Sequence, residues 1–164
     1  SPDRKRLAEV RFDSVNSCHR VHIFDRESGT DGPSWALTSN ELVNRLLFSD
    51  DGKFLYIEGL LTLTSYSTLR RVNVETGHEI CTRVITHPHD LRFIWLRQGA
   101  LVVLPLRESM CVFAMVAHDN FANEIWNTQV PVPHDAVRVL HEGPPLVIAT
   151  WHGNRNVRVT FINV

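Results

Sequence analysis

Hydrophobic and polar positions alternate along most of the chain in short runs that are bounded by turn sequences. Between Phe48 and Gly77, two runs rich in Leu, Phe, Tyr, Ile and Val are bounded by Ser49-Asp50-Asp51-Gly52-Lys53 and Glu75-Thr76-Gly77. Asp and Gly favour tight turns, and the intervening residues suit a half-buried strand. A clear hairpin pattern also occurs near the C-terminal end, where Leu146 to Trp151 and Val157 onward flank residues 152–155.

This unit recurs along the chain. Ser1-Pro2-Asp3 corresponds to the turn at Ser49, and residues 21–29 match residues 69–77, both at an offset of 48 residues. Farther on, Glu79-Ile80 and Pro88-His89-Asp90 recur 45 residues later as Glu124-Ile125 and Pro133-His134-Asp135. A recurrence every 45–48 residues indicates an internal repeat of one supersecondary unit. Four copies can be traced, of which the first and last are incomplete.

Each complete copy is predicted to hold four strands. The predicted strands are 5–11, 19–25 and 34–38; 42–48, 54–59, 68–74 and 78–84; 90–96, 100–106, 110–116 and 123–130; and 135–140, 145–151 and 156–163. Ser39 to Leu47 also fits a short helix with Val43, Leu46 and Leu47 on one face, but its place in the repeat favours an inner strand. Longer loops are expected at 13–17 and 60–67.

The repeat resembles β-propeller blades of the WD40 kind. Phe48-Ser49-Asp50-Asp51-Gly52 resembles the turn of that family, and Ile23-Phe24-Asp25 and Arg71-Val72-Asn73-Val74 resemble the hydrophobic-Asp pair that closes its third strand. The same turns are also similar to those of TolB-type propellers, so the subfamily stays open. No Trp-Asp dipeptide closes a unit, and the family's hydrogen-bonded Asp–His–Ser/Thr lattice is therefore not implied.

The resemblance implies an all-β fold, a β-propeller-type array of about four four-stranded blades with the first and last incomplete. We expect one partial propeller domain over residues 1–164, with blades at 1–38, 39–84, 85–130 and 131–164. A blade buries its apolar faces only against neighbouring blades. The chain is therefore expected to be a segment of a larger propeller or an open arc completed by another chain, with a closed four-bladed ring as the lesser alternative.

Composition narrows the function classes. The 164 residues are 43% hydrophobic and 21% charged, with a net charge of −1, which predicts a folded domain without a basic surface for nucleic acid. No apolar stretch is long enough for a membrane span. Cys18, Cys81 and Cys111 show no CxxC spacing, which favours a reducing compartment. We expect a cytoplasmic protein, with the nucleus possible, that binds neither nucleic acid nor membrane.

Candidate chemistry is sparse. The loop Thr86-His87-Pro88-His89-Asp90 and the loop Pro133-His134-Asp135 carry residues that could hold Zn²⁺, contact a partner or simply order the backbone. Adjacent Cys18 and His19 should point to opposite faces of a strand, and Asp50-Asp51 is explained by its turn. We predict no catalytic residue, no metal, no cofactor and no enzymatic activity.

The sequence thus favours a non-catalytic protein–protein interaction scaffold that presents its loops to other proteins or to further blades of the same protein. The four tryptophans are expected to fill the spaces between blades. The alternative is a propeller enzyme or a ligand-binding propeller with an axial polar pocket. The residues nominated for partner binding are His87, His89, Asp90, Arg92, His134, Asp135, Trp126 and Trp151.

Overall fold

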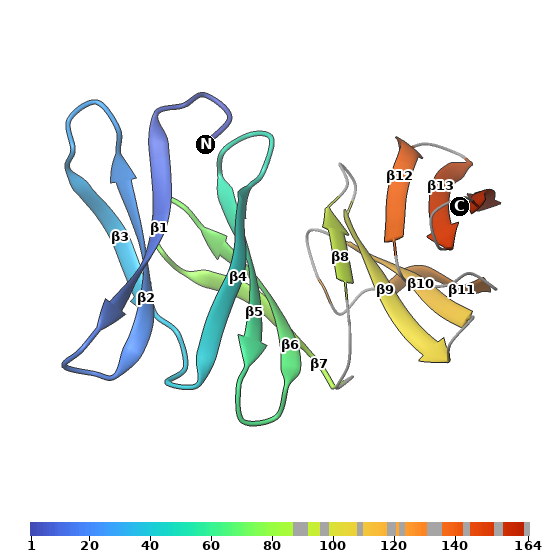
Figure 1. Ribbon diagram of the computed structural model, residues 1–164. Helices are drawn as coiled ribbons and strands as arrows, with labels where there is room; N and C mark the ends of the chain where they lie inside the picture. The colour runs from blue at the N-terminus through green and yellow to red at the C-terminus, as the bar shows by residue number, and fades with distance from the viewer. Residues whose placement is uncertain are drawn as a thin grey trace. The chain divides into compact units, whose positions relative to one another are not determined.

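The computed structural model describes residues 1–86, 92–95, 99–107, 110–117, 121, 124–130, 136–142, 145–152 and 156–162. All regular structure in these ranges is β-strand (Figure 1). The strands are β1 Arg6–Asp13, β2 Cys18–Asp25, β3 Asp31–Ala36, β4 Glu41–Phe48, β5 Phe54–Leu61, β6 Tyr66–Asn73, β7 Glu79–Ile85, β8 Arg92–Trp95, β9 Gly99–Arg107, β10 Met110–Ala117, β11 Glu124–Val130, β12 Ala136–Glu142, β13 Leu146–His152 and β14 Asn156–Ile162.

These strands form four antiparallel sheets in which sequence neighbours pair. Sheet 1 holds β1–β3, sheet 2 holds β4–β7, sheet 3 holds β8–β11 and sheet 4 holds β12–β14. The prediction of an all-β array of four similar units is therefore confirmed. The helical alternative for Ser39–Leu47 is wrong because β4 pairs with β5 from Glu41↔Leu61 to Phe48↔Leu55.

The two expected loop excursions are shorter than predicted. β1 and β2 are joined by residues 14–17, and β5 and β6 are joined by residues 62–65. In each hairpin the last turn residue, Ser17 or Ser65, has a positive φ, of 50° and 57° respectively. That conformation lets both strands continue pairing up to the turn, which the polar composition of these segments did not reveal.

The repeat is visible in the backbone of the first two sheets. Three residues of sheet 1 and its turns have positive φ, and each has a counterpart 48 residues later. The pairs are Arg4 and Gly52, Ser17 and Ser65, and Gly29 and Gly77. Equal conformations at three equivalent positions show that the 48-residue offset of the sequence is an offset between equivalent structural units.

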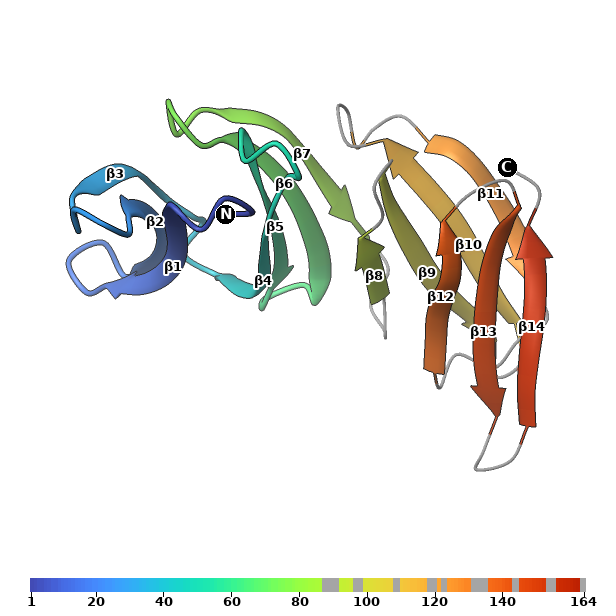
Figure 2. The ribbon, with the colours of Figure 1, turned by 90° about the horizontal axis from the view of Figure 1, so that it is seen from above.

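The chain divides into two compact units, Ser1–Pro88 and His89–Val164. In the first unit, sheets 1 and 2 face each other (Figure 2). They share one apolar core of buried side chains, with Trp35 and Phe48 packed against it. The buried members are Val21, Ile23, Leu37, Leu55, Ile57, Val72 and Val74.

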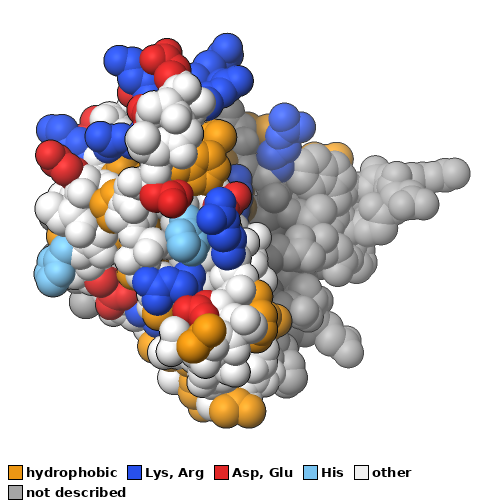
Figure 3. Space-filling model, turned by 90° about the vertical axis from the view of Figure 1, so that its left-hand side faces the viewer, with side chains coloured by type: hydrophobic (Ala, Val, Ile, Leu, Met, Phe, Trp, Pro, Cys, Tyr) orange, Lys and Arg blue, Asp and Glu red, His pale blue; other side chains and the backbone are white. Residues whose placement is uncertain are grey.

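Trp35 confirms the expectation that tryptophan fills the space between blades, whereas the side chains of Trp95, Trp126 and Trp151 lie outside what the structure describes. Strand alternation explains which residues enter the core. Val10 and Val21 are paired and face sheet 2, so the neighbouring pair Glu9 and His22 lies on the opposite face of sheet 1. Figure 3 shows that charged and histidine side chains gather over this outer side of the first unit.

The second unit contains sheets 3 and 4. Leu146 and Ile148 of β13 are buried, whereas Val157, Val159 and Phe161 of β14 are exposed. Within the described residues, no helix is long and apolar enough to span a membrane. Within the described residues, neither Cys18 nor Cys81 forms a disulfide bond.

Gly29 and Gly77 provide a matched test of how sheet 2 packs against sheet 1. Both residues have φ near +67°, but a Cβ at Gly29 would meet no atom within 4 Å, whereas a Cβ at Gly77 would lie 2.9 Å from Pro33 Cβ. We expect Gly29→Ala to cost about 1–2 kcal/mol from its left-handed conformation alone. Gly77→Ala should cost about 1–3 kcal/mol more because it also crowds Pro33. Urea unfolding of both variants measures the difference, and equal losses would contradict this packing.

Candidate functional site

The antiparallel order of the strands brings four turns of the first unit to one edge. β1, β3, β5 and β7 begin there, and β2, β4 and β6 end there (Figure 1). The turns are residues 1–5 before β1, 26–30 between β2 and β3, 49–53 between β4 and β5, and 74–78 between β6 and β7. We call this side of the first unit the turn edge.

Two of these turns are held by a serine and an aspartate. Ser49 Oγ donates a hydrogen bond to Asp51 Oδ1 at 2.7 Å, and the Lys53 N–H donates to the same oxygen at 3.0 Å. The same two bonds occur in the turn before β1, with Ser1, Asp3 and Lys5 at 2.5 and 3.1 Å. The Ser-x-Asp sequence therefore stabilises each turn through a hydrogen bond from a backbone N–H to the aspartate side chain, as expected for such turns.

The other two turns are held by the residue that ends each third-strand motif. Asp25 Oδ1 accepts hydrogen bonds from the N–H groups of Glu27 and Ser28 at 3.0 and 2.8 Å. Asn73 Oδ1 accepts the equivalent bonds from the N–H groups of Glu75 and Thr76 at 2.9 and 3.0 Å. This geometry explains why an Asx residue closes each unit, because only a short side-chain oxygen reaches both N–H groups.

Hydrogen bonds lower the pKa of three aspartates that line the pocket. The hydrogen bond from Ser1 lowers the pKa of Asp3, and that from Ser49 lowers the pKa of Asp51. The backbone N–H of Ser28 does the same for the pKa of Asp25. Hydrogen bonds that favour the charged form act in this direction. These three carboxylates are therefore ionised more readily than an ordinary aspartate, and their hydrogen bonds fix them in place.

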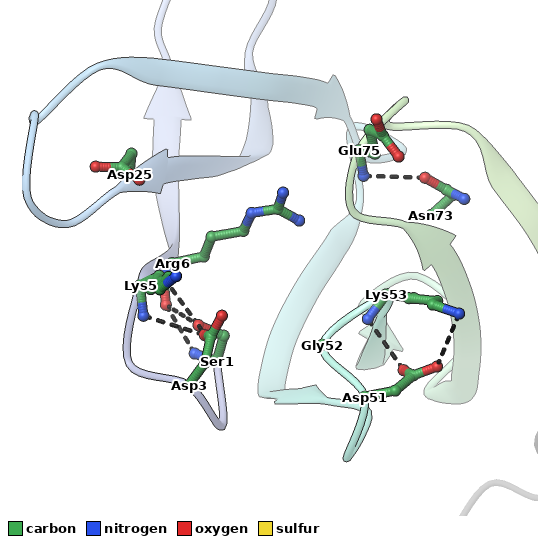
Figure 4. A pocket seen from close by; sticks show the side chains of 10 residues that line it. All are labelled: Ser1, Asp3, Lys5, Arg6, Asp25, Asp51, Gly52, Lys53, Asn73 and Glu75. Carbon is green, nitrogen blue, oxygen red and sulfur yellow. Dashed lines mark hydrogen bonds and ion pairs between the residues drawn. The ribbon is translucent and has the colours of Figure 1, made fainter.

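An open pocket of about 470 Å³ lies between the turns of the two sheets (Figure 4). A second hollow of about 220 Å³ adjoins it through the shared residues Arg6, Asp25 and Glu75, and is walled in part by Phe24 and Pro33. The pocket is lined mainly by charged and polar residues. These residues are Ser1, Asp3, Lys5, Arg6, Asp25, Asp51, Gly52, Lys53, Asn73 and Glu75. The arrangement suits recognition of a polar or charged group rather than of an apolar ligand.

A separate charged cluster lies inside sheet 2. Glu41 is 0% exposed, and its Oε1 accepts hydrogen bonds from Thr68 Oγ1 at 2.6 Å and Arg70 Nε at 3.0 Å. Its Oε2 accepts from Arg70 Nη2 at 2.7 Å and Thr38 Oγ1 at 2.9 Å. Gly59 makes room for this cluster, since a Cβ there would lie 2.4 Å from Thr68 Oγ1 and 2.7 Å from Glu41 Oε1. Every carboxylate lone pair has a partner, so the cluster is structural.

The residues nominated from the sequence do not belong to the described pocket. His87, His89, Asp90, His134 and Asp135 lie outside the described residues. Arg92, Trp126 and Trp151 lie in β8, β11 and β13, but their side chains are likewise outside the description. Their role in partner binding thus stays a prediction. In the part of the chain that is described, no group of three His, Cys, Asp or Glu side chains could hold a metal ion.

Other sequence-based interpretations can be compared with the geometry. Cys18 is buried, whereas the neighbouring His19 lies with its ring 5.5 Å from Phe12 and its Nδ1 3.2 Å from the Glu41 carbonyl oxygen. His19 therefore connects the two sheets. Asp51 accepts the hydrogen bonds of the 49–53 turn, as its sequence predicted. The convergence of Lys5 and Arg6 with Glu75 on one pocket has no local sequence signal.

The comparisons with known proteins concern the fold. No family model matches the sequence, and no curated protein matches it. The whole chain superposes on 55% of the β-propeller domain of the Trilobed protease from Pyrococcus furiosus, a propeller with an open velcro topology, at a TM-score of 0.64 and 14% identity. It also matches Pyrococcus horikoshii acylaminoacyl peptidase over 91% of this chain and 26% of that chain, at a TM-score of 0.56 and 11% identity.

These similarities define the class of protein. The chain is an all-β, β-propeller-type array of four sheets, of which the first and last have three strands in the described residues. It spans about half the length of the Trilobed protease propeller chain that it matches. The propeller expectation from the sequence is confirmed at the level of the fold.

Proposed function

We propose that the chain is a non-catalytic protein–protein interaction module that uses the turn edge of its first unit to bind another protein. The observation that supports this most directly is the pocket of about 470 Å³ between turns that are each tied by Asp or Asn side chains. A rigid pocket loses little conformational freedom on binding, which favours affinity. The WD40-like turns agree with such a role, and cytoplasm or nucleus is the proposed location.

Filling the pocket should abolish partner binding. We expect the double substitution Lys5→Trp and Lys53→Trp to place two indole rings at the pocket and to reduce recovery of specific partners about tenfold or more, because steric exclusion acts whatever the partner's charge. Arg26→Trp is the matched control, since Arg26 is an exposed residue of the same edge that does not line the pocket. Affinity capture from the native source with quantitative mass spectrometry measures recovery. Identical partner sets for the double variant and the wild type would contradict the proposal.

A second candidate function comes from the two similar structures. Both are described as parts of a protease or peptidase. The chain could therefore accompany a catalytic domain and form part of a propeller enzyme or a ligand-binding propeller with an axial polar pocket. A peptide-hydrolysis assay of the natural full-length protein, read by mass spectrometry, discriminates the candidates. Peptide cleavage would favour the enzyme, and partner capture without cleavage would favour the interaction module.

A further inference from the structure

The charges that line the pocket are not evenly matched. Lys53 Nζ lies 3.9 Å from Asp51 Oδ2. The positive charge of Lys5 helps to stabilise the Asp3 carboxylate, and that of Arg6 helps to stabilise the Asp25 carboxylate. Each aspartate of the pocket thus has a cation of its own, from the same turn for Asp3 and Asp51 and from the start of β1 for Asp25.

Glu75 is the exception. Its backbone N–H is bound to Asn73 Oδ1, but its carboxylate makes no hydrogen bond or ion pair with any residue in the described part of the chain. Glu75 is exposed and lines both the pocket and the adjoining hollow. Figure 4 shows Arg6 extending from the start of β1 toward the turn that carries Glu75 without a bond between them. The joined hollows are therefore lined by more carboxylates than cationic side chains, and the surplus negative charge is located at Glu75 and at Asp31 of the smaller hollow.

The surroundings of Glu75 suit a long basic side chain. The smaller hollow is walled by Phe24, Pro33 and Val74, of which Phe24 and Pro33 are partly exposed. Lysine and arginine bury their aliphatic stems on such surfaces while the charged end stays at a polar site. An acidic side chain would instead approach three fixed aspartates, each of which weakens its binding to Lys5 or Arg6.

We propose that Glu75 is the anchor of a site for an arginine or lysine side chain of the protein partner, with an apolar residue of the partner in the hollow beside it. This inference rests on the proposed function of the turn edge and adds the chemistry of the partner. The guanidinium or ammonium group binds the Glu75 carboxylate, and the stem lies along Phe24 and Pro33. The partner is thus a segment that presents a basic residue next to an apolar one.

The repeat supplies a control that differs in position alone. Glu27 lies 48 residues before Glu75, is also exposed, and also has its N–H bound to the Asx oxygen of its turn. Glu27 lines neither hollow. Glu75→Gln and Glu27→Gln therefore remove the same charge from the same turn type, and only the first removes it from the proposed site.

The probe is N-acetyl-Arg-Leu-amide, with N-acetyl-Glu-Leu-amide as its acidic counterpart. In an NMR titration of the ¹⁵N-labelled chain we expect the basic peptide to shift the amides of Asn73 and Glu75, more weakly as salt is added. Glu75→Gln should weaken binding about three- to fivefold, the usual range for an exposed ion pair. Glu27→Gln should leave binding unchanged. Circular dichroism confirms that both variants are folded.

Two outcomes would overturn the inference: equal binding of the basic peptide by Glu75→Gln and the wild type, or tighter binding of the acidic peptide. The second result would make Arg6 and Lys5 the receiving groups. The partner-capture experiment separates the two proposals. If the Lys5→Trp/Lys53→Trp variant loses partners that Glu75→Gln retains in full, partner binding at the turn edge is supported and the basic-residue site at Glu75 is contradicted. If neither variant loses partners, both proposals fail.

Discussion

Glu41→Gln is expected to lower the free energy of unfolding by about 3–5 kcal/mol, because it leaves a largely buried guanidinium without its main counter-charge. The Arg70 side chain is only 13% exposed and binds Glu41 through both Nε and Nη2. The carboxylate of Glu41 also accepts hydrogen bonds from Thr68 and Thr38. A neutral amide cannot accept all of these bonds, since one of its two polar atoms is a donor.

Glu79→Gln is the matched control. Glu79 binds the same guanidinium, through Arg70 Nη1 at 2.5 Å, but its side chain is 42% exposed. Water replaces much of what this carboxylate supplies, so its loss should cost less than about 1 kcal/mol. Urea denaturation near neutral pH measures both values. Similar losses in the two variants would contradict the view that burial makes Glu41 the dominant partner.

Acid should act on the same cluster. Burial alone would raise the pKa of Glu41, but the hydrogen bonds from Arg70 and Thr68 outweigh burial and hold the pKa below its ordinary value. The unfolded chain then binds a proton more readily than the folded chain does. The stability that Glu41 contributes is complete above the ordinary glutamate pKa, about 4.3, and is lost as the pH falls through the lower folded value. As the pH falls below about 4.3, the stability of Glu41→Gln should therefore decrease less steeply than that of the wild type.

Local sequence was sufficient to predict the strands. Turn residues with a known conformational reason, such as Gly52 with φ of +69°, separate runs of alternating apolar residues, and each strand so predicted overlaps an observed one. The 48-residue offset was also predictable, because equivalent turns need equivalent side chains. Ser49 and Asp51 repeat the hydrogen bonds of Ser1 and Asp3.

The charged cluster could not be predicted in this way. Glu41 meets Thr68 and Arg70, which lie 27 and 29 residues away, and the contact requires Gly59 to be paired with Thr68. In the sequence, Glu41 occurs in a segment that also fits an amphipathic helix, where a glutamate is expected to face water. Only the register of three strands shows that it is buried.

The pocket has the same origin. It requires turns from both sheets, and turn composition does not distinguish Glu75 from Glu27, whose backbone N–H groups make the same hydrogen bond. The difference arises because sheet 1 faces the β6–β7 turn of sheet 2, whereas Glu27 itself lines neither hollow. Equivalent residues of a repeat thus acquire different environments from their neighbours, and the site depends on the contact between sheets.

That contact depends on the apolar core shared by sheets 1 and 2, and Ile57→Ala should weaken it most directly. Ile57 is 0% exposed and packs in one cluster with Val21 and Ile23 of sheet 1. Truncation should cost about 2–5 kcal/mol from lost burial and the cavity left behind. Ile80→Ala, at a β7 residue that is 45% exposed, is the control and should cost less than about 1 kcal/mol.

The location of the loss matters as much as its size. Because the core belongs to both sheets, Ile57→Ala should accelerate hydrogen exchange at Val21 and Ile23 in sheet 1 as well as at Leu55 and Val72 in sheet 2. The peptide probe should bind more weakly in proportion to the fraction of molecules in which the sheets have separated. If exchange rose in sheet 2 alone while binding at Glu75 was retained, the two sheets would not form one cooperative unit. The pocket would then have to be held by the turn-edge contacts, such as that between Gly77 and Pro33, without support from the core.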